Sequence, residues 1–142
     1  MIVLKFGGTS VGRVENIQKI KAILQWKNEP YVLVVSAFSG VTNLLEKMAN
    51  ESIHGQSKAL IDELINKHRQ MIVDLKISEI ACSSTIDNYL ESIQTLSNGI
   101  ESLCELSNRT LAKMMSYGEL MSSTIVFYSF LLILLIWFMI PR

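Results

Sequence analysis

The stretch MIVLKFGGTSVG, residues 1–12, places a lysine and two adjacent glycines directly after a short apolar run. The run contains β-branched residues and ends at Gly7, which is typical of a buried strand followed by a tight turn. From Val14 onward, apolar residues recur at helical spacing, so a helix is expected after the turn. The pair Glu29–Pro30 ends that helix, and YVLVVSAF, residues 31–38, predicts a second apolar strand. Together these segments predict a β-α-β unit with parallel strands and a right-handed crossover.

Helical periodicity continues through the rest of the charged part of the chain. The polar residues SGVTN at 39–43 predict a loop and a helix start before LLEKMA. Apolar residues at helical spacing predict two longer amphipathic helices, within residues 60–75 and 86–103. His68 lies on the apolar face of the first of these, and we interpret it as a core histidine rather than a catalytic one.

A last helix is expected over residues 108–126, and it leads into a stretch of different character. Asn108 or Thr110 is its expected cap, and Gly118 is an internal weak point because glycine destabilises a helix relative to alanine. The residues from Leu120 to Pro141 carry no charged side chain.

Composition limits the classes of protein to which the chain can belong. At 142 residues it is long enough to bury a core without metals or disulfides. Its 13 Lys and Arg residues balance 13 Asp and Glu residues, so no basic field suggests nucleic acid as a partner. Cys82 and Cys104 lie far apart and only two histidines accompany them, so we expect structural or free thiols and no metal site. The N-terminus lacks a basic region and a cleavage site typical of a secretory signal, so the cytoplasm is the expected location.

The glycine turn after the first strand is suited to bind an anion. Backbone N–H groups at a turn that feeds a helix are unpaired, and the helix dipole favours negative charge there. Lys5 is expected to project from the strand end toward the same space, where it could hold a transferring phosphoryl group. The pattern is neither a P-loop nor a dinucleotide-binding fingerprint, because the lysine precedes the glycines and Thr9 stands where GxGxxG needs glycine. A tight turn with a solvent-facing lysine is the alternative interpretation.

Three segments resemble successive signatures of the aspartokinases, within the wider amino acid kinase family. They are VLKFGGTSVG at 3–12, VVSAFSGVTNLL at 34–45 and SYGELMSS at 116–123, in the family's order. The first is shared across the amino acid kinases, whereas the second and third are specific to aspartokinases. The resemblance implies the N-terminal part of the kinase domain, and it leaves open whether the parent protein is a bifunctional aspartokinase/homoserine dehydrogenase.

This resemblance implies an α/β fold and a phosphoryl transfer reaction. The fold would be part of a three-layer, carbamate-kinase-like domain, with a mostly parallel sheet, flanking helices and an apolar C-terminal helix. The reaction would transfer a phosphoryl group from MgATP to the β-carboxylate of L-aspartate, the first step toward lysine, threonine and methionine. The family needs no tightly bound cofactor and is usually homo-oligomeric.

The resemblance also implies roles for individual residues. Lys5 would be the catalytic lysine, and the adjoining turn would bind the nucleotide phosphates together with it, through Gly7, Gly8, Thr9 and Ser10. Ser36, Thr42 and Glu119 would bind L-aspartate, with Glu119 accepting from the α-ammonium and Thr42 donating to a carboxylate. The simpler interpretations are that Glu119 is a solvated helix residue and that Thr42 only caps a helix.

The resemblance ends near Ile125, and we divide the chain there into residues 1–124, the N-terminal lobe of an amino acid kinase domain, and residues 125–142, an apolar tail. The uncharged stretch 120–141 allows a transmembrane or tail-anchor segment, since about 20 apolar residues span a bilayer. The tail could also be a buried helix and strand of a short protein, or the product of a frame-shifted or truncated gene. The second lobe of the kinase domain is missing from these residues, so we expect an inactive fragment. The alternative is a non-catalytic, tail-anchored or interaction protein that retains the lobe.

Overall fold

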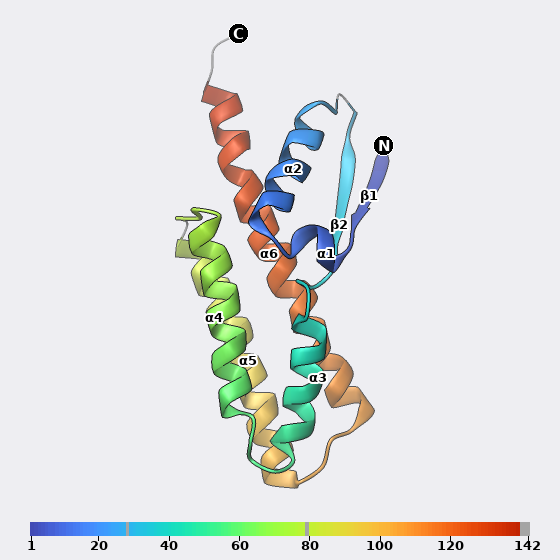
Figure 1. Ribbon diagram of the computed structural model, residues 1–142, viewed down its shortest axis with the longest axis vertical. Coiled ribbons are helices and arrows are strands. Elements are labelled where there is room, and N and C mark those ends of the chain that lie inside the picture. The colour runs from blue at the N-terminus through green and yellow to red at the C-terminus, as the bar shows by residue number, and fades with distance from the viewer. Residues whose placement is uncertain (28, 79, 140–142) are drawn as a thin grey trace.

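A computed structural model describes the chain over residues 1–27, 29–78 and 80–139, with side chains described as far as residue 131 (Figure 1). Two short strands alternate with helices in the first quarter of the chain, and the remainder is helical. The elements in chain order are β1 (Ile2–Phe6), α1 (Gly8–Val11), α2 (Val14–Gln25), β2 (Tyr31–Val35), α3 (Val41–Ser52), α4 (Lys58–Asp74), α5 (Ile80–Leu103) and α6 (Asn108–Met139).

The predicted β-α-β unit is confirmed. β1 and β2 pair in parallel, in a register that runs from Ile2 opposite Tyr31 to Phe6 opposite Val35. A single-turn helix, α1, fills the glycine turn before α2 begins, and the sequence pattern did not predict it. Both strands run in the same direction, so their carboxyl ends lie at the same edge of the sheet.

The two faces of this sheet differ. Leu33 and Val35 face a groove that is also lined by Leu24 of α2 and by Val126 and Phe130 of α6.

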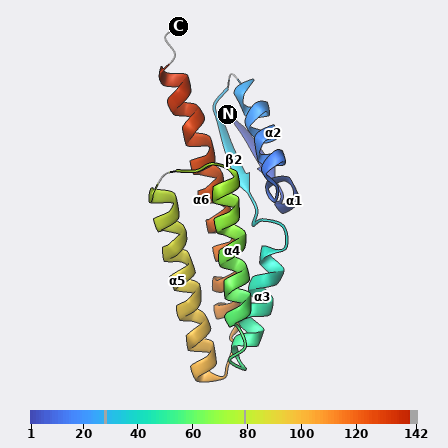
Figure 2. The ribbon, with the colours of Figure 1, turned by 60° about the vertical axis from the view of Figure 1, so that its left-hand side comes forward.

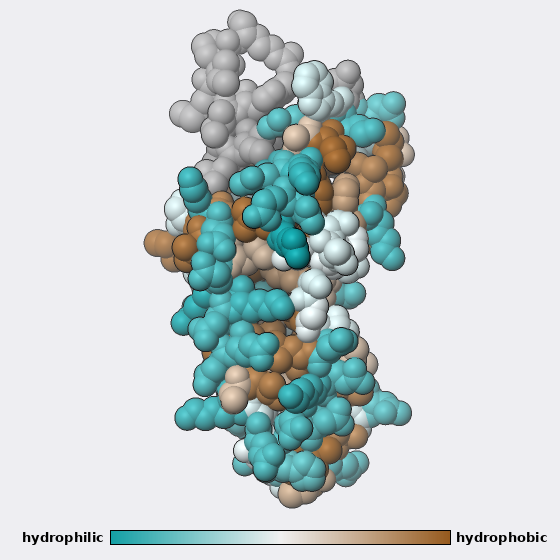
Figure 3. Space-filling view, in the orientation of Figure 1, coloured by the Kyte–Doolittle hydropathy of each residue, from teal (hydrophilic) through white to brown (hydrophobic). Residues whose placement is uncertain are grey.

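The opposite face of the sheet is exposed, since Val3, Val32 and Val34 keep 63%, 44% and 41% of their surface accessible. Hydrophobic residues accordingly gather over the strands in Figure 3, whereas much of the helical part is hydrophilic on the face shown. The predicted parallel sheet with flanking helices is confirmed, and the described residues build two of the three expected layers.

Helices α3 to α6 form the larger part of the core (Figure 2). α6 contacts both α3 and α5, and it also reaches β2, so it links the bundle to the sheet. Its side chains Met114, Met121 and Ile125 are fully buried. α6 passes through the boundary drawn after residue 124 without a break.

A cluster of buried hydroxyl groups joins three helices at one end of the bundle. Ser97 of α5 hydrogen-bonds to Ser52 at the end of α3 and to Ser57 just before α4, with 2.8 Å between the oxygens in both cases. All three side chains are buried. We call these three residues the serine cluster. It satisfies polar groups that would otherwise be costly to bury.

Helix α6 begins differently from the prediction. Neither Asn108 nor Thr110 caps it, because the hydroxyl oxygen of Ser107 accepts a hydrogen bond from the backbone N–H of Thr110 at 3.1 Å. Ser107 therefore occupies the capping position, one residue before the expected start.

None of the helices is both long enough and apolar enough to cross a membrane within the part of the chain whose residues are fully described. The prediction of a membrane segment concerns residues 120–141. Side chains from 132 and the whole of 140–142 lie outside the described residues.

Candidate functional site

The ends of the two strands place Lys5 and Ser36 on one face of the sheet. Lys5 is paired with Val34 in the register, and both side chains belong to the exposed face. The backbone N–H of Ser36 donates to the carbonyl of Phe6 at 3.1 Å, which extends the ladder one step past β2. Side chains alternate along an extended chain, so Ser36 lies on the same face as Val34 and Lys5.

The glycine turn forms a single helical turn with open amides. The carbonyl of Gly7 accepts from the N–H groups of Ser10 at 2.9 Å and Val11 at 3.2 Å. The N–H groups of Gly8 and Thr9 precede the first bonded amide, so they have no partner within α1 and point out of its N-terminus. Because α1 is only one turn long, these two amides, rather than a long helix dipole, supply its attraction for anions.

The turn is fixed from two sides. The side-chain amide of Asn16 on α2 donates to the carbonyl of Thr9 at 3.1 Å. On the other side, a Cβ atom added at Gly8 would lie 2.5 Å from the carbonyl oxygen of Ala37. No real Cβ approaches an oxygen so closely, so only glycine lets the first and second motifs touch backbone to backbone.

The third motif meets the second at Gly118. A Cβ atom there would lie 3.1 Å from side-chain carbons of Ala37, Val41 and Leu45. The prediction that Gly118 is merely a weak point of the helix is therefore incomplete, since its missing side chain lets α6 approach α3. We call the meeting of Gly8, Ala37 and Gly118 the motif junction.

A buried hydroxyl group ties α6 to the end of β2. Ser122 donates toward the carbonyl of Ser36 at 2.9 Å and toward that of Glu119 at 3.1 Å. Glu119 follows Gly118 directly, so the junction holds its backbone close to the loop after β2, while its side chain is exposed.

Thr42 lies in the first turn of α3. This helix begins after Gly40, whose φ of +79° is the left-handed conformation that favours glycine, and no side chain caps it. The alternative interpretation of Thr42 as a helix cap is therefore wrong. Within the described part of the chain, the side chains of Lys5, Thr42 and Glu119 make no hydrogen bond or ion pair with protein groups. These three groups are exposed and available to a ligand.

Sequence reasoning missed three contributors to this arrangement: Asn16, Ala37 and Ser122. The signal for the last two was their position inside the second and third motifs. Asn16 lies in the amphipathic pattern of α2 and gave no signal. His68, predicted to be a core histidine, is fully buried, and burial is the main cause that lowers its pKa.

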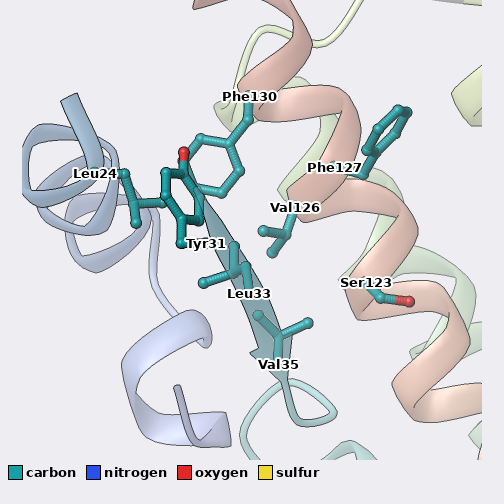
Figure 4. A pocket seen from close by; sticks show the side chains of 8 residues that line it. All are labelled: Leu24, Tyr31, Leu33, Val35, Ser123, Val126, Phe127 and Phe130. Carbon is teal, nitrogen blue, oxygen red and sulfur yellow. The ribbon is translucent and has the colours of Figure 1, made fainter. Parts of the chain in front are cut away.

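The candidate site is distinct from the apolar groove between β2, α2 and α6 (Figure 4). That groove has a volume of about 240 Å³ and is lined by apolar and aromatic side chains with two hydroxyl-bearing residues, Tyr31 and Ser123. It carries no charged group, so it fits neither a phosphate nor a zwitterion. A second recess, also of about 240 Å³, lies beside the glycine turn, between Ser10, Asn16 and Lys19. No group of three potential metal ligands occurs among the fully described residues.

The chain matches no protein-family model. It is 31% identical over 126 residues to an aspartokinase of Chlamydia trachomatis, and 33% identical over 132 residues to chloroplastic aspartokinase 1 of Arabidopsis thaliana. Its fold superposes on E. coli aspartokinase III in complex with aspartate and ADP with a TM-score of 0.80 at 26% identity, over 91% of the chain. This chain is related to the aspartokinases.

The match to the aspartokinases covers most of this chain but a small part of each relative. It spans 88% of the chain and 26% of the Chlamydia trachomatis aspartokinase, and 87% of the chain and 22% of the Arabidopsis thaliana protein. Of aspartokinase III it covers 28%. The chain thus spans about a quarter of the length of the aspartokinases it matches.

Proposed function

We propose that the chain provides the phosphate end and part of the aspartate end of an aspartate kinase site. The reaction would transfer a phosphoryl group from MgATP to the β-carboxylate of L-aspartate. The observation that carries this proposal is the motif junction, which gathers three segments distant in sequence at the carboxyl ends of two parallel strands. The complex of E. coli aspartokinase III with aspartate and ADP supports the choice of ligands.

The nucleotide phosphates would bind at the glycine turn. The open amides of Gly8 and Thr9 would donate hydrogen bonds to phosphate oxygens, and the Ser10 hydroxyl would donate a further one. Gly7 would leave room for the phosphates beside the turn. Nothing lies within 4 Å of the position of a Cβ at Gly7, so a ligand can approach its backbone. Lys5 would place its ammonium on the transferring phosphoryl group and stabilise the charge that spreads over its oxygens.

L-aspartate would bind between the loop after β2 and α6. Glu119 would accept hydrogen bonds from the substrate ammonium, and the Thr42 and Ser36 hydroxyls would donate to its carboxylates. Phosphoryl transfer of this kind depends on positioning and charge neutralisation and needs no protein nucleophile. Magnesium would arrive with ATP as part of the substrate.

Isothermal titration of the 142-residue chain with L-aspartate, with MgADP and with the magnesium complex of a non-hydrolysable ATP analogue, which keeps the γ-phosphoryl group, tests the proposal. Lys5→Ala should weaken binding of the ATP analogue about tenfold or more while L-aspartate binding persists, because a charge-assisted contact contributes about 1.5–3 kcal/mol. Glu119→Gln should produce the opposite pattern. Lys47→Ala and Glu91→Gln, at exposed positions of α3 and α5, are the matched controls. Folded chain that binds neither ligand would contradict the proposal.

Turnover is a separate measurement. We further propose that the complete reaction requires residues beyond the matched quarter of the relatives, so the chain alone should form no aspartyl phosphate. Trapping of the acyl phosphate as its hydroxamate measures this directly. A signal above that of a Lys5→Ala sample would show that the 142 residues suffice.

A further inference from the structure

His68 lies behind the loop that carries two of the proposed aspartate ligands. It comes from α4, outside the three motifs, and its side chain has no exposed surface. Its ring stacks on Phe38 with 5.6 Å between the centroids and a tilt of 32°. Phe38 is 1% exposed and lies between β2 and α3. We call residues Ser36–Thr42, the connection after β2 together with the first two residues of α3, the Ser36–Thr42 loop. A helix from the middle of the chain therefore supports this loop from beneath.

The orientation of the His68 ring is fixed by a hydrogen bond. Its Nδ1 lies 2.8 Å from the carbonyl oxygen of Leu64, one turn earlier on α4. A carbonyl only accepts, so Nδ1 carries the proton and donates it. The ring plane is thereby set, together with the face that it presents to Phe38.

The two ring nitrogens of His68 differ in their hydrogen bonding. Nε2 is buried and has no hydrogen-bond partner among the described residues. Burying a polar atom without a partner costs about 1–3 kcal/mol, a cost that phenylalanine at this position would avoid. The bond from Nδ1 is what the imidazole adds over an apolar ring of similar size.

Phe38 in turn connects to the proposed site on both sides. Its carbonyl accepts from the N–H of Val41 at 3.0 Å, which sets the turn into α3 just before Thr42. Ala37, on its other side, is part of the motif junction. Lys67, the residue before His68 on α4, also reaches the loop, because its Nζ lies 3.4 Å from where a Cβ of Gly40 would be.

We propose that His68 is a positioning residue that holds the Ser36–Thr42 loop in its ligand-binding conformation through the stacked ring of Phe38. Its effect on L-aspartate rests on the proposed function, whereas its effect on the loop does not. The role requires both halves of the side chain: the Nδ1 donor that orients the ring, and the ring that contacts Phe38.

Two substitutions separate these halves. His68→Phe keeps a ring of similar size and loses the donor, and His68→Asn keeps a donor at the place of Nδ1 and loses the ring. Ile72→Val, one turn farther along α4 and also buried, removes one methylene group and leaves both contacts intact. It is the matched control for a general loss of packing.

Amide hydrogen exchange of the full chain gives the first readout. In both His68 variants the two hydrogen-bonded amides at this turn, Val41 (to the Phe38 carbonyl) and Leu44 (to the Gly40 carbonyl), should exchange about tenfold faster relative to those in the middle of α5, the change expected for one lost hydrogen bond. Ile72→Val should shift loop and α5 amides together or not at all. A His68→Phe chain whose loop exchanges like the wild type would overturn the proposal, because packing alone would then explain the histidine.

Ligand affinity gives the second readout. Both His68 variants should bind L-aspartate about tenfold more weakly while their affinity for MgADP stays within twofold, since the glycine turn does not contact His68. Equal weakening of both ligands would also overturn the proposal. Wild-type chain that binds no L-aspartate would contradict the proposed function, and the exchange experiment would still decide the role of His68.

Discussion

At the motif junction, three segments pack closely because glycine has no side chain, whereas at the serine cluster three helices are joined by hydrogen bonds between serine hydroxyls. An extra Cβ at Gly8 would lie 2.5 Å from a backbone oxygen. Removing the hydroxyl of Ser97 would leave two buried hydroxyls without a shared partner. The first region should therefore fail when atoms are added and the second when they are removed. Substitutions chosen on this basis test the contrast directly.

The largest effect is expected from Gly8→Ala. The neighbouring atom is a backbone carbonyl, which cannot rotate away, so the two loops must separate and we expect a loss of about 3 kcal/mol or more. Urea unfolding measures it as a lower midpoint at an unchanged slope. Gly99→Ala is the control: it lies inside α5 with nothing within 4 Å, so it should stabilise the chain by about 0.5–1 kcal/mol. Equal stability of the two variants would show that the close backbone contact does not make Gly8 more sensitive to an added methyl group than Gly99.

Ser97→Ala should be the next most damaging. Ser52 retains a hydrogen bond to the Met48 carbonyl at 2.7 Å, but the Ser57 hydroxyl loses its hydrogen bond to Ser97, so we expect a loss of about 1–3 kcal/mol in the free energy of unfolding. Calorimetric melting provides the measurement. Ser92→Ala removes a hydroxyl from the same helix. Among the described residues this hydroxyl bonds only to the Asn88 carbonyl, so its loss should change stability by less than about 0.5 kcal/mol. Similar losses in both variants would show that the cluster has no special role.

Acid should destabilise the chain through His68, whose ring contacts Phe38 next to the motif junction. Burial lowers the pKa of this imidazole, the hydrogen bond to Leu64 raises it, and the charge of Lys67 lowers it. The pKa of His68 in the folded chain is therefore below the ordinary value of 6.5. The unfolded chain then binds more protons, and stability is complete above pH 6.5 and falls as the pH drops toward the folded pKa. One proton contributes at most about 1.4 kcal/mol per pH unit.

Comparison with His68→Phe isolates this contribution. The difference in unfolding free energy between wild type and variant should change between pH 7 and pH 5, with the wild type losing more. A difference that is constant over this range would mean that His68 does not titrate on folding.

The smallest effect is expected at the surface of the bundle. Arg69 and Asp87 join α4 to α5 at 3.5 Å, with 63% and 57% of their side chains exposed. Such pairs are screened by solvent, so Asp87→Asn should cost less than about 0.5 kcal/mol. A loss comparable to that of Ser97→Ala would show that charge, rather than the buried hydroxyls, joins these helices.

Local patterns were sufficient to predict the β-α-β unit. Strand alternation and helical spacing depend on residues close in sequence, and β1, α2 and β2 appear where these patterns place them. The second strand is shorter than predicted, because it ends at Val35 rather than at Phe38. Ala37 packs against Gly8 and Phe38 packs against His68, and these contacts join residues that are distant in sequence, so no local pattern predicts them.

The sequence predicted which side chains belong to the candidate site, but not the contacts that hold its segments together. The motifs identified Lys5, Ser36 and Glu119 as candidate ligand-binding residues. Helix propensity, in contrast, predicted only that Gly118 destabilises its helix. Its value appears only when α3 is packed against it. The same holds for Ser122, whose hydroxyl contacts a carbonyl 86 positions away in the sequence. Glycine and serine make such contacts with few atoms, so they leave little signal in hydropathy.

The uncovered face of the sheet has a consequence for handling the protein. Its outward side chains are Val3, Val32, Val34 and Lys5, so we expect the Lys5 ammonium to oppose association of this valine surface with itself. Lys5→Ala would therefore lower colloidal stability as well as phosphate affinity. Lys5→Arg, which keeps the charge, should remain as soluble as the wild type, and light scattering of the two variants at matched concentration would separate precipitation from lost binding.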